Sequence, residues 1–174
     1  VEIDTRTSEV ESVTPLPEQP DAIAVTPEAL WVTNVGARTI ARVGLDDREV
    51  EVRGGMPAVG AIASTPGGDV WVGNLGGRAV TLVNARGADF RDPPLAVTVP
   101  GGVIDVAAGG GHLWVANTDG EDVPGRVTRV DLATNKVSSS IPVGRFPASV
   151  VFGAGSVWVA NYGEGTVSVI EAGS

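Results

Sequence analysis

The chain has no cysteine and only one histidine, His112, among its 174 residues. Without cysteine it forms no disulfide, offers no thiolate nucleophile and has no cysteine ligand for a zinc site. One histidine cannot build a histidine-rich metal site or supply chemistry that needs two histidines. We therefore expect no metal, no cofactor and no catalytic residue of these kinds.

Positive charge and long apolar runs are also scarce. Twelve Lys and Arg residues stand against 21 Asp and Glu residues, which gives a formal net charge of −9. This deficit argues against nucleic-acid binding, because such binding needs a basic surface that displaces counterions. No run approaches the roughly 18 apolar residues that a membrane-spanning helix requires. We expect a single folded domain over residues 1–174, with neither a nucleic-acid partner nor direct membrane insertion.

The chain does contain a fourfold repeat. The words WVTN, WVGN, WVAN and WVAN stand at 31–34, 71–74, 114–117 and 158–161, so successive tryptophans lie 40, 43 and 44 residues apart. Each period holds four short strand-like segments separated by Gly, Pro, Asn and Asp, and none has room for a crossover helix. A period of this length with four strands predicts an all-β chain of four-stranded antiparallel β-propeller blades.

The tryptophan word is interpreted as structure and not as a ligand site. Consecutive residues of a strand point to opposite faces, yet Trp and both of its neighbours are apolar, so both faces should be buried. This predicts an inner strand packed between two neighbouring blades. The asparagine should end that strand by bonding its own backbone two residues on, and it tolerates a left-handed backbone in the following turn.

The words WVTN, WVGN and WVAN, with VDLATNKVSSSIPVG between them, closely resemble the YVTN-type (WVAN-repeat) β-propeller repeats of bacterial proteins. The resemblance covers essentially the whole chain. Such proteins include cell-surface proteins, extracytoplasmic sensor domains, lactonase-type enzymes and a streptogramin lyase. The resemblance implies a propeller with a face of loops and an extracytoplasmic location (secreted, periplasmic or cell-surface), but no single activity.

The two ends of the chain leave ring closure open. The opening VEID matches the third strand of a period and SEVESVT the fourth, whereas TVSVI near the other end is again a third strand. Residues Val10–Thr14 could pair with Val167–Ile170 and close a four-blade ring. Alternatively the four blades form an arc of a larger propeller. Two such arcs would form one eight-blade ring, a homodimer.

Candidate binding residues follow the tryptophan words, in the loops expected at one face of the propeller. Arg38, Arg78 and Arg126 occupy near-equivalent places and could together bind a carboxylate or phosphate, or each could cover its own blade. The third repeat carries an acidic insertion with Asp119, Glu121 and Asp122. It is interpreted as a solvated loop or a place for specialised contacts.

A second candidate group comes from the link before the fourth repeat and the turn after its tryptophan word. Arg145, Phe146 and Tyr162 would form a partner-binding patch if they were exposed together; alternatively Phe146 packs under the loop. We expect a non-enzymatic binding, sensor or scaffold module that recognises a protein, peptide or glycan through its loop face. The alternative is a lactonase- or streptogramin-lyase-like enzyme.

Overall fold

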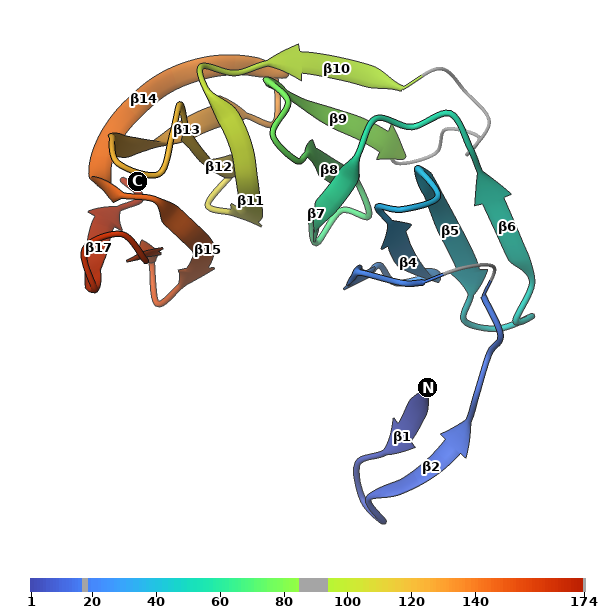
Figure 1. The fold of residues 1–174 in the computed structure, drawn as a ribbon. Helices are drawn as coiled ribbons and strands as arrows, with labels where there is room; N and C mark the ends of the chain where they lie inside the picture. Colours follow the sequence, from blue (N-terminus) through green and yellow to red (C-terminus); the bar gives the residue numbers. More distant parts are fainter. Residues whose placement is uncertain (17–18, 85–93, 174) are drawn as a thin grey trace.

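The computed structural model describes residues 1–16, 19–84 and 94–173, and all of its regular elements are β-strands (Figure 1). Within these ranges no helix occurs that could cross a membrane. Every pairing between named strands is antiparallel, so short turns join neighbouring strands as the repeat predicts.

Four sheets follow one another along the chain, and each begins with its innermost strand. Sheet 1 contains β3 (Ala22–Val25), β4 (Ala29–Asn34), β5 (Thr39–Gly44) and β6 (Val50–Arg53). Sheet 2 contains β7 (Val59–Ser64), β8 (Val70–Asn74), β9 (Ala79–Asn84) and β10 (Leu95–Thr98). Sheet 3 contains β11 (Gly102–Gly109), β12 (His112–Thr118), β13 (Pro124–Asp131) and β14 (Lys136–Arg145). Sheet 4 has three strands, β15 (Pro147–Gly153), β16 (Ser156–Asn161) and β17 (Thr166–Glu171).

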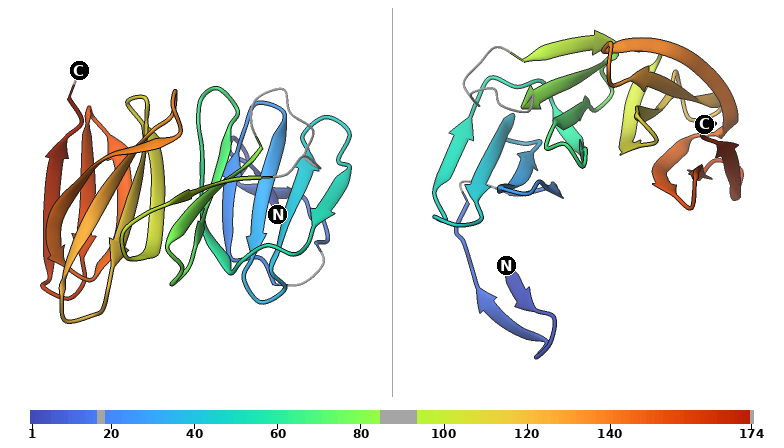
Figure 2. Two further views of the ribbon diagram at one scale, coloured as in Figure 1. Left: turned by 90° about the horizontal axis from the view of Figure 1, so that it is seen from above. Right: turned by 180° about the vertical axis from the view of Figure 1, so that it is seen from behind.

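The four sheets stand side by side along an open arc, with their first strands on the concave side (Figures 1 and 2). A separate hairpin of β1 (Glu2–Asp4) and β2 (Glu9–Ser12) extends from the sheet 1 end of the arc. The expectation that VEID and SEVESVT form a third and a fourth strand agrees with this hairpin. The sheet order confirms the predicted four-strand period in sheets 1 to 3.

The core lies between neighbouring sheets, and a tryptophan occupies each of the three junctions. Trp31 packs with residues of sheet 2, Trp71 with residues of sheet 3 and Trp114 with residues of sheet 4. Each of these side chains is at most 1% exposed. Truncating a fully buried tryptophan costs about 3–5 kcal/mol, so these contacts hold the arc together.

The fourth tryptophan differs from the others. Trp158 is 41% exposed, because no further sheet covers its face of sheet 4. The prediction that both faces of every tryptophan strand are buried is therefore wrong for this repeat. Asn34, Asn74 and Asn161 end their strands as predicted, whereas β12 continues one residue past Asn117 to Thr118, and the bonds made by the side chains differ from those predicted. The amides of Asn34 and Asn161 donate across the hairpin to the hydroxyls of Thr39 and Thr166, at 3.0 and 3.1 Å.

The ring is not closed within one chain. Among the residues that the structure describes, strand β2 pairs with β1, with Ile3 opposite Val10, and β17 pairs only with β16. The predicted alternative in which Val10–Thr14 pairs with Val167–Ile170 is wrong for this structure, because the two segments lie at opposite ends of the arc (Figure 1). The open-arc alternative describes the chain.

Candidate functional site

A cavity of about 300 Å³ opens near the C-terminal ends of the tryptophan strands of sheets 2 and 3, in the middle of the arc. It spans the junction between sheets 2 and 3 and reaches the link into sheet 4. The backbone closes this junction, because the amide of Gly76 donates to the carbonyl of Val103 and the amide of Val103 to the carbonyl of Gly77. The cavity is lined by Gly76, Arg78, Gly102, Ile104, Thr118, Asp119, Gly120, Glu121 and Phe146.

An ion pair crosses this cavity between neighbouring sheets. The guanidinium of Arg78, from the β8–β9 turn, donates to Asp119 Oδ1 at 2.7 Å. Asp119 belongs to the acidic insertion that follows β12. Both side chains are well exposed, so the pair adds little stability and orients the two loops. Two of the residues predicted as separate candidates are thus partners.

The other acids of the insertion remain available to solvent. Glu121 and Asp122 are exposed, and Glu121 borders the cavity. Within the described part of the chain Glu121 makes no ion pair and accepts no hydrogen bond. The loop itself is ordered by Thr118, whose hydroxyl donates to the carbonyl of Gly120 at 2.7 Å. The loop that this bond closes therefore presents the Glu121 carboxylate beside the Arg78–Asp119 pair.

The predicted Arg–Phe–Tyr group is assembled in the structure. Two backbone hydrogen bonds join its segments: Tyr162 N donates to Phe146 O at 2.9 Å, and Gly163 N to Arg145 O at 3.0 Å. The rings of Phe146 and Tyr162 meet edge to face with centroids 6.0 Å apart. Arg145 pairs with Glu164 at 3.6 Å. Phe146 is half-buried against the cavity, whereas Tyr162 is 78% exposed.

Phe146 adopts a backbone conformation that bulky residues seldom take. Its φ is +47°, in the left-handed region, and Pro147 follows it directly. Such a conformation costs of the order of 1–3 kcal/mol and persists where surrounding contacts hold it. Strain of this kind clusters at ligand-binding sites. It keeps the Phe146 ring at the cavity wall.

Two predicted residues lie outside this cluster. Arg38 and Arg126 are exposed, and neither lines the cavity. Their equivalence also fails in register. Arg38 and Arg78 directly precede β5 and β9, and Thr39 after Arg38 lies opposite Asn34, whereas Arg126 lies within β13 and itself stands opposite Asn117. A shift of one position turns a strand side chain to the other face. The near-equivalence of all three arginines is therefore wrong for Arg126.

Sequence reasoning missed two aspartates on the concave side of the arc. Asp21 and Asp105 both border a second cavity, of about 420 Å³, beside the innermost strands. Asp105 Oδ2 accepts hydrogen bonds from Val150 N at 2.9 Å and Ser149 Oγ at 3.0 Å, so it ties sheet 3 to sheet 4. Asp21 accepts one from the Val35 amide. The arrangement of sheets 3 and 4 brings Asp105 to its partners, and no local pattern signals that contact.

His112 lies at the other end of the sheets. Strand β12 begins at His112 and ends at Thr118 beside the cavity, so roughly 20 Å separate them at about 3.3 Å per residue. Its Nδ1 lies 2.7 Å from the carbonyl oxygen of Gly110, and its ring packs on Trp114 at 5.5 Å. Among the described residues no three His, Asp or Glu side chains gather in a metal-binding arrangement.

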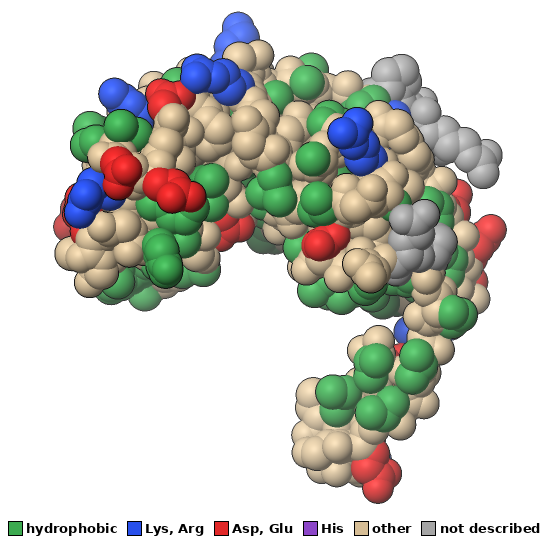
Figure 3. Space-filling model, viewed as in Figure 1, with side chains coloured by type: hydrophobic (Ala, Val, Ile, Leu, Met, Phe, Trp, Pro, Cys, Tyr) green, Lys and Arg blue, Asp and Glu red, His purple; other side chains and the backbone are tan. Residues whose placement is uncertain are grey.

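Space-filling Figure 3 shows how the surface is divided. Acidic and basic side chains intermingle over the part of the arc that holds sheets 3 and 4. Hydrophobic side chains are exposed on the hairpin and toward the ends of the arc. On this face the hairpin is therefore mainly apolar, whereas the part of the arc that holds sheets 3 and 4 carries both charged and apolar side chains.

No protein-family model and no curated protein sequence matches the chain. Solved structures do match it. Virginiamycin B lyase from Staphylococcus aureus, determined with quinupristin, gives a TM-score of 0.69 at 16% identity, over 90% of this chain and 58% of that one. AztD from Citrobacter koseri gives 0.66 at 11% identity, over 89% and 44%. A luciferin-regenerating enzyme gives 0.62 at 15% identity, over 82% and 53%.

These likenesses establish the fold alone. Identities this low give no information about function. The chain is all-β and shares its arrangement of small antiparallel sheets with β-propeller proteins. It spans about half the length of the solved structures that it matches. Several of those structures are enzymes by name, including a glutaminyl cyclase from Myxococcus xanthus. Propellers of this shape therefore serve both enzymatic and other roles.

Proposed function

We propose that sheets 1 to 4 are consecutive blades of a YVTN-type propeller and that the chain is a non-enzymatic binding module. The cavity beside Arg78, Asp119 and Glu121, with the Phe146–Tyr162 pair, forms its recognition surface. A protein or peptide segment that carries a basic side chain fits this surface best; a glycan is the weaker fit. Function at a bacterial cell surface or in the periplasm is part of the proposal.

The observation that carries the proposal is the grouping of an exposed aromatic residue with an unpaired carboxylate on ordered loops. Tyrosine supplies a large contact area at low entropic cost, and such residues dominate binding at interfaces. Glu121 offers a negative charge that no described side chain neutralises, so it attracts a Lys or Arg of the ligand. The strained backbone at Phe146 supports a preorganised wall.

The test is binding of immobilised basic, acidic and neutral peptides, together with a glycan array, to the chain and its variants. We expect basic peptides to bind best, and Tyr162→Ala and Glu121→Gln each to weaken binding about tenfold, which corresponds to about 1.4 kcal/mol. Lys136→Ala is the control, because Lys136 is exposed at the opposite end of sheet 3. Binding that is indifferent to both site variants contradicts the proposal, and turnover of quinupristin or a lactone contradicts its non-enzymatic part.

A further inference from the structure

The two ends of the arc are the two halves of one sheet-to-sheet junction. At the junction of sheets 2 and 3, Trp71 and its neighbours pack on the adjoining face of sheet 3. Sheet 4 presents the same tryptophan face, and no other sheet of the described residues packs on it. Sheet 1 presents the same receiving face toward the hairpin. The equivalences follow from strand register, residue by residue.

The tryptophan face of sheet 4 matches that of sheet 2. Trp158 stands between Val151 and Val169, as Trp71 stands between Ala63 and Leu82. Val167 corresponds to Val80. The sheet 2 residues belong to the core, whereas those of sheet 4 are exposed. The exposed fractions in sheet 4 are 41% for Trp158, 52% for Val169, 56% for Val151 and 63% for Val167.

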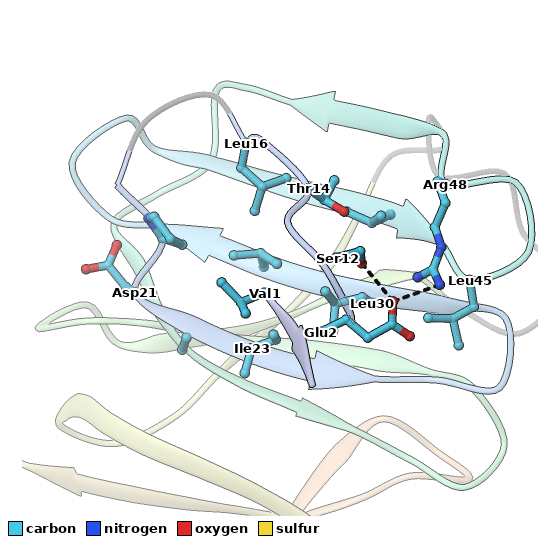
Figure 4. A pocket seen from close by; sticks show the side chains of 14 residues that line it. Val1, Glu2, Ser12, Thr14, Leu16, Asp21, Ile23, Leu30, Leu45 and Arg48 are labelled. Atoms are coloured by element: carbon cyan, nitrogen blue, oxygen red, sulfur yellow. Dashed lines mark hydrogen bonds and ion pairs between the residues drawn. The ribbon is translucent and has the colours of Figure 1, made fainter. Parts of the chain in front are cut away.

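The receiving face of sheet 1 matches that of sheet 3. Ile23 pairs with Val32 as Val106 pairs with Val115, and Leu30 precedes Trp31 as Leu113 precedes Trp114. In sheet 3 these positions enclose Trp71. In sheet 1 they line a cavity of about 300 Å³ between the sheet and the hairpin (Figure 4). Its apolar wall consists of Ile23, Leu30, Val32, Val43 and Leu45, with Val1 and Leu16 opposite.

The strand count provides a second, independent match. Sheet 4 has three strands and a free outer edge on β17, whereas sheets 1 to 3 each have four strands. The hairpin corresponds to the third and fourth strands of a sheet, with β1 matching β13 and β2 matching β14. Ser12 faces Glu2 in the hairpin, and Ser139 faces Arg129 in sheet 3. Residues 1–16 are exposed or half-buried throughout, so little packing fixes the hairpin. Its main tie to sheet 1 is an ion pair between Glu2 and Arg48 at 2.8 Å.

We propose that a second copy of the chain docks on these ends and closes a two-chain ring. Trp158 of each copy enters the cavity at Ile23 and Leu30 of the other. Strand β17 of each copy takes the place of β1 beside β2 of the other, which completes sheet 4 with a fourth strand. A head-to-tail contact of this kind closes when two arcs each supply about half of a ring. The chain spans 58% of virginiamycin B lyase and 53% of the luciferin-regenerating enzyme, in keeping with about half of a ring.

Light scattering of the purified chain in solution tests this inference. We expect a monodisperse particle with twice the 17.7 kDa chain mass that dissociates on dilution. A monomer at all concentrations, or an open-ended series of larger species, overturns the proposal. The monomer result would assign the two faces to blades other than those of a second copy. Peptide binding at the loop face is measured separately, so either proposal can fail without the other.

Two charge variants locate the contact. Trp158→Glu and Ile23→Glu should each give monomers, because each places a carboxylate in the closed junction; both side chains are exposed in a single chain, so folding should persist. Val137→Glu is the control, since Val137 is also 41% exposed but lies on the outer strand of sheet 3. Near-ultraviolet circular dichroism of the three buried tryptophans verifies the fold of each variant.

Mixing the two monomeric variants decides between head-to-tail and symmetric contact. Each variant keeps the end that the other has lost, so one junction remains intact in the mixture. We expect two-chain particles to reappear, with weaker association than in the unmodified chain. Dimers of Ile23→Glu on its own would show that Trp158 meets Trp158 and would overturn the head-to-tail arrangement.

Discussion

At the scale of single residues, the junction tryptophans occupy one position but differ in hydrogen bonding. The indole nitrogen of Trp31 donates to Thr26 Oγ1 at 3.2 Å, and that of Trp114 donates to the Gly109 carbonyl at 3.0 Å. The indole nitrogen of Trp71 is buried without a hydrogen-bond partner among the described residues. A buried N–H group without a hydrogen-bond partner costs free energy. Replacing the indole with a phenyl ring, which has no N–H group, removes that cost.

We therefore predict that Trp71→Phe destabilises the fold less than Trp114→Phe, by about 1 kcal/mol. Trp114→Phe loses the indole hydrogen bond to the Gly109 carbonyl and replaces the indole ring, whose centroid lies 5.9 Å from the Arg129 guanidinium, with a smaller phenyl ring. Urea unfolding of both variants provides the free energies, with the volume change matched between them. An equal or larger loss for Trp71→Phe would show that the indole nitrogen of Trp71 has a partner.

The residue scale also shows where sequence reasoning ends. The Trp-Val-x-Asn pattern predicts a buried inner strand because each tryptophan and both of its neighbours are apolar. The burial of Trp31, Trp71 and Trp114 confirms this prediction. The pairing of Arg78 with Asp119 joins residues 41 positions apart in neighbouring sheets. Neither residue carries a local signal of the other, so the ion pair emerges only when the sheets are placed.

At the scale of elements, the turn from β13 to β14 depends on one ionised carboxylate. Asp131 Oδ1 accepts hydrogen bonds from the hydroxyl and the backbone amide of Thr134, both at 2.8 Å. These bonds lower the pKa of Asp131, the hydroxyl bond contributing most. Asp4 holds the β1–β2 turn in the same way, and the backbone amide of Arg6 is the main cause of its lowered pKa.

A carboxyl with a lowered pKa in the folded state stabilises the fold above its unfolded pKa, which is about 3.9 for aspartate. That contribution disappears as the pH falls through the lower folded value. We predict that Asp131→Asn is less stable than the unmodified chain at pH 7 and that the difference shrinks below about pH 4. Denaturant unfolding across this range measures it.

The control for this prediction is Asp46→Asn, which removes an exposed carboxylate from the β5–β6 turn. Within the described structure Asp46 accepts no hydrogen bond. Its substitution should leave the dependence of stability on pH close to that of the unmodified chain. If Asp131→Asn follows the same curve as this control, the turn does not rely on the ionised carboxylate.

Element boundaries follow from the sequence more closely than element surroundings do. Gly, Asn and Asp mark the turns, so the four-strand period could be read directly. The exposure of Trp158 could not be predicted from the sequence, because it depends on whether another sheet stands beside sheet 4. The same holds for β1 and β2, whose strand character was predicted but whose partner was left open.

At the scale of the whole molecule, we propose that the free faces of sheets 4 and 1 belong together in a ring of two chains. The sequence defines the repeat but not the ring, because each blade contacts only its neighbours. Closure depends on how the terminal faces are occupied. The chain lacks cysteine, so a pair introduced at the proposed junction reports on closure without background.

The most direct measurement is disulfide formation in the double variant Ser12→Cys, Val169→Cys. Val169 lies opposite Trp158, as Arg129 lies opposite Trp114 in sheet 3. Arg129 in turn faces Ser139 of the fourth strand, and Ser12 of β2 corresponds to Ser139. In the two-chain ring Val169 therefore faces Ser12 of the other copy. Directly opposed strand residues come close enough for a disulfide. We predict a covalent two-chain species with both bonds formed, seen by mass under non-reducing conditions. A bond within one chain, or no bond beyond that in the single-cysteine controls, would contradict the account.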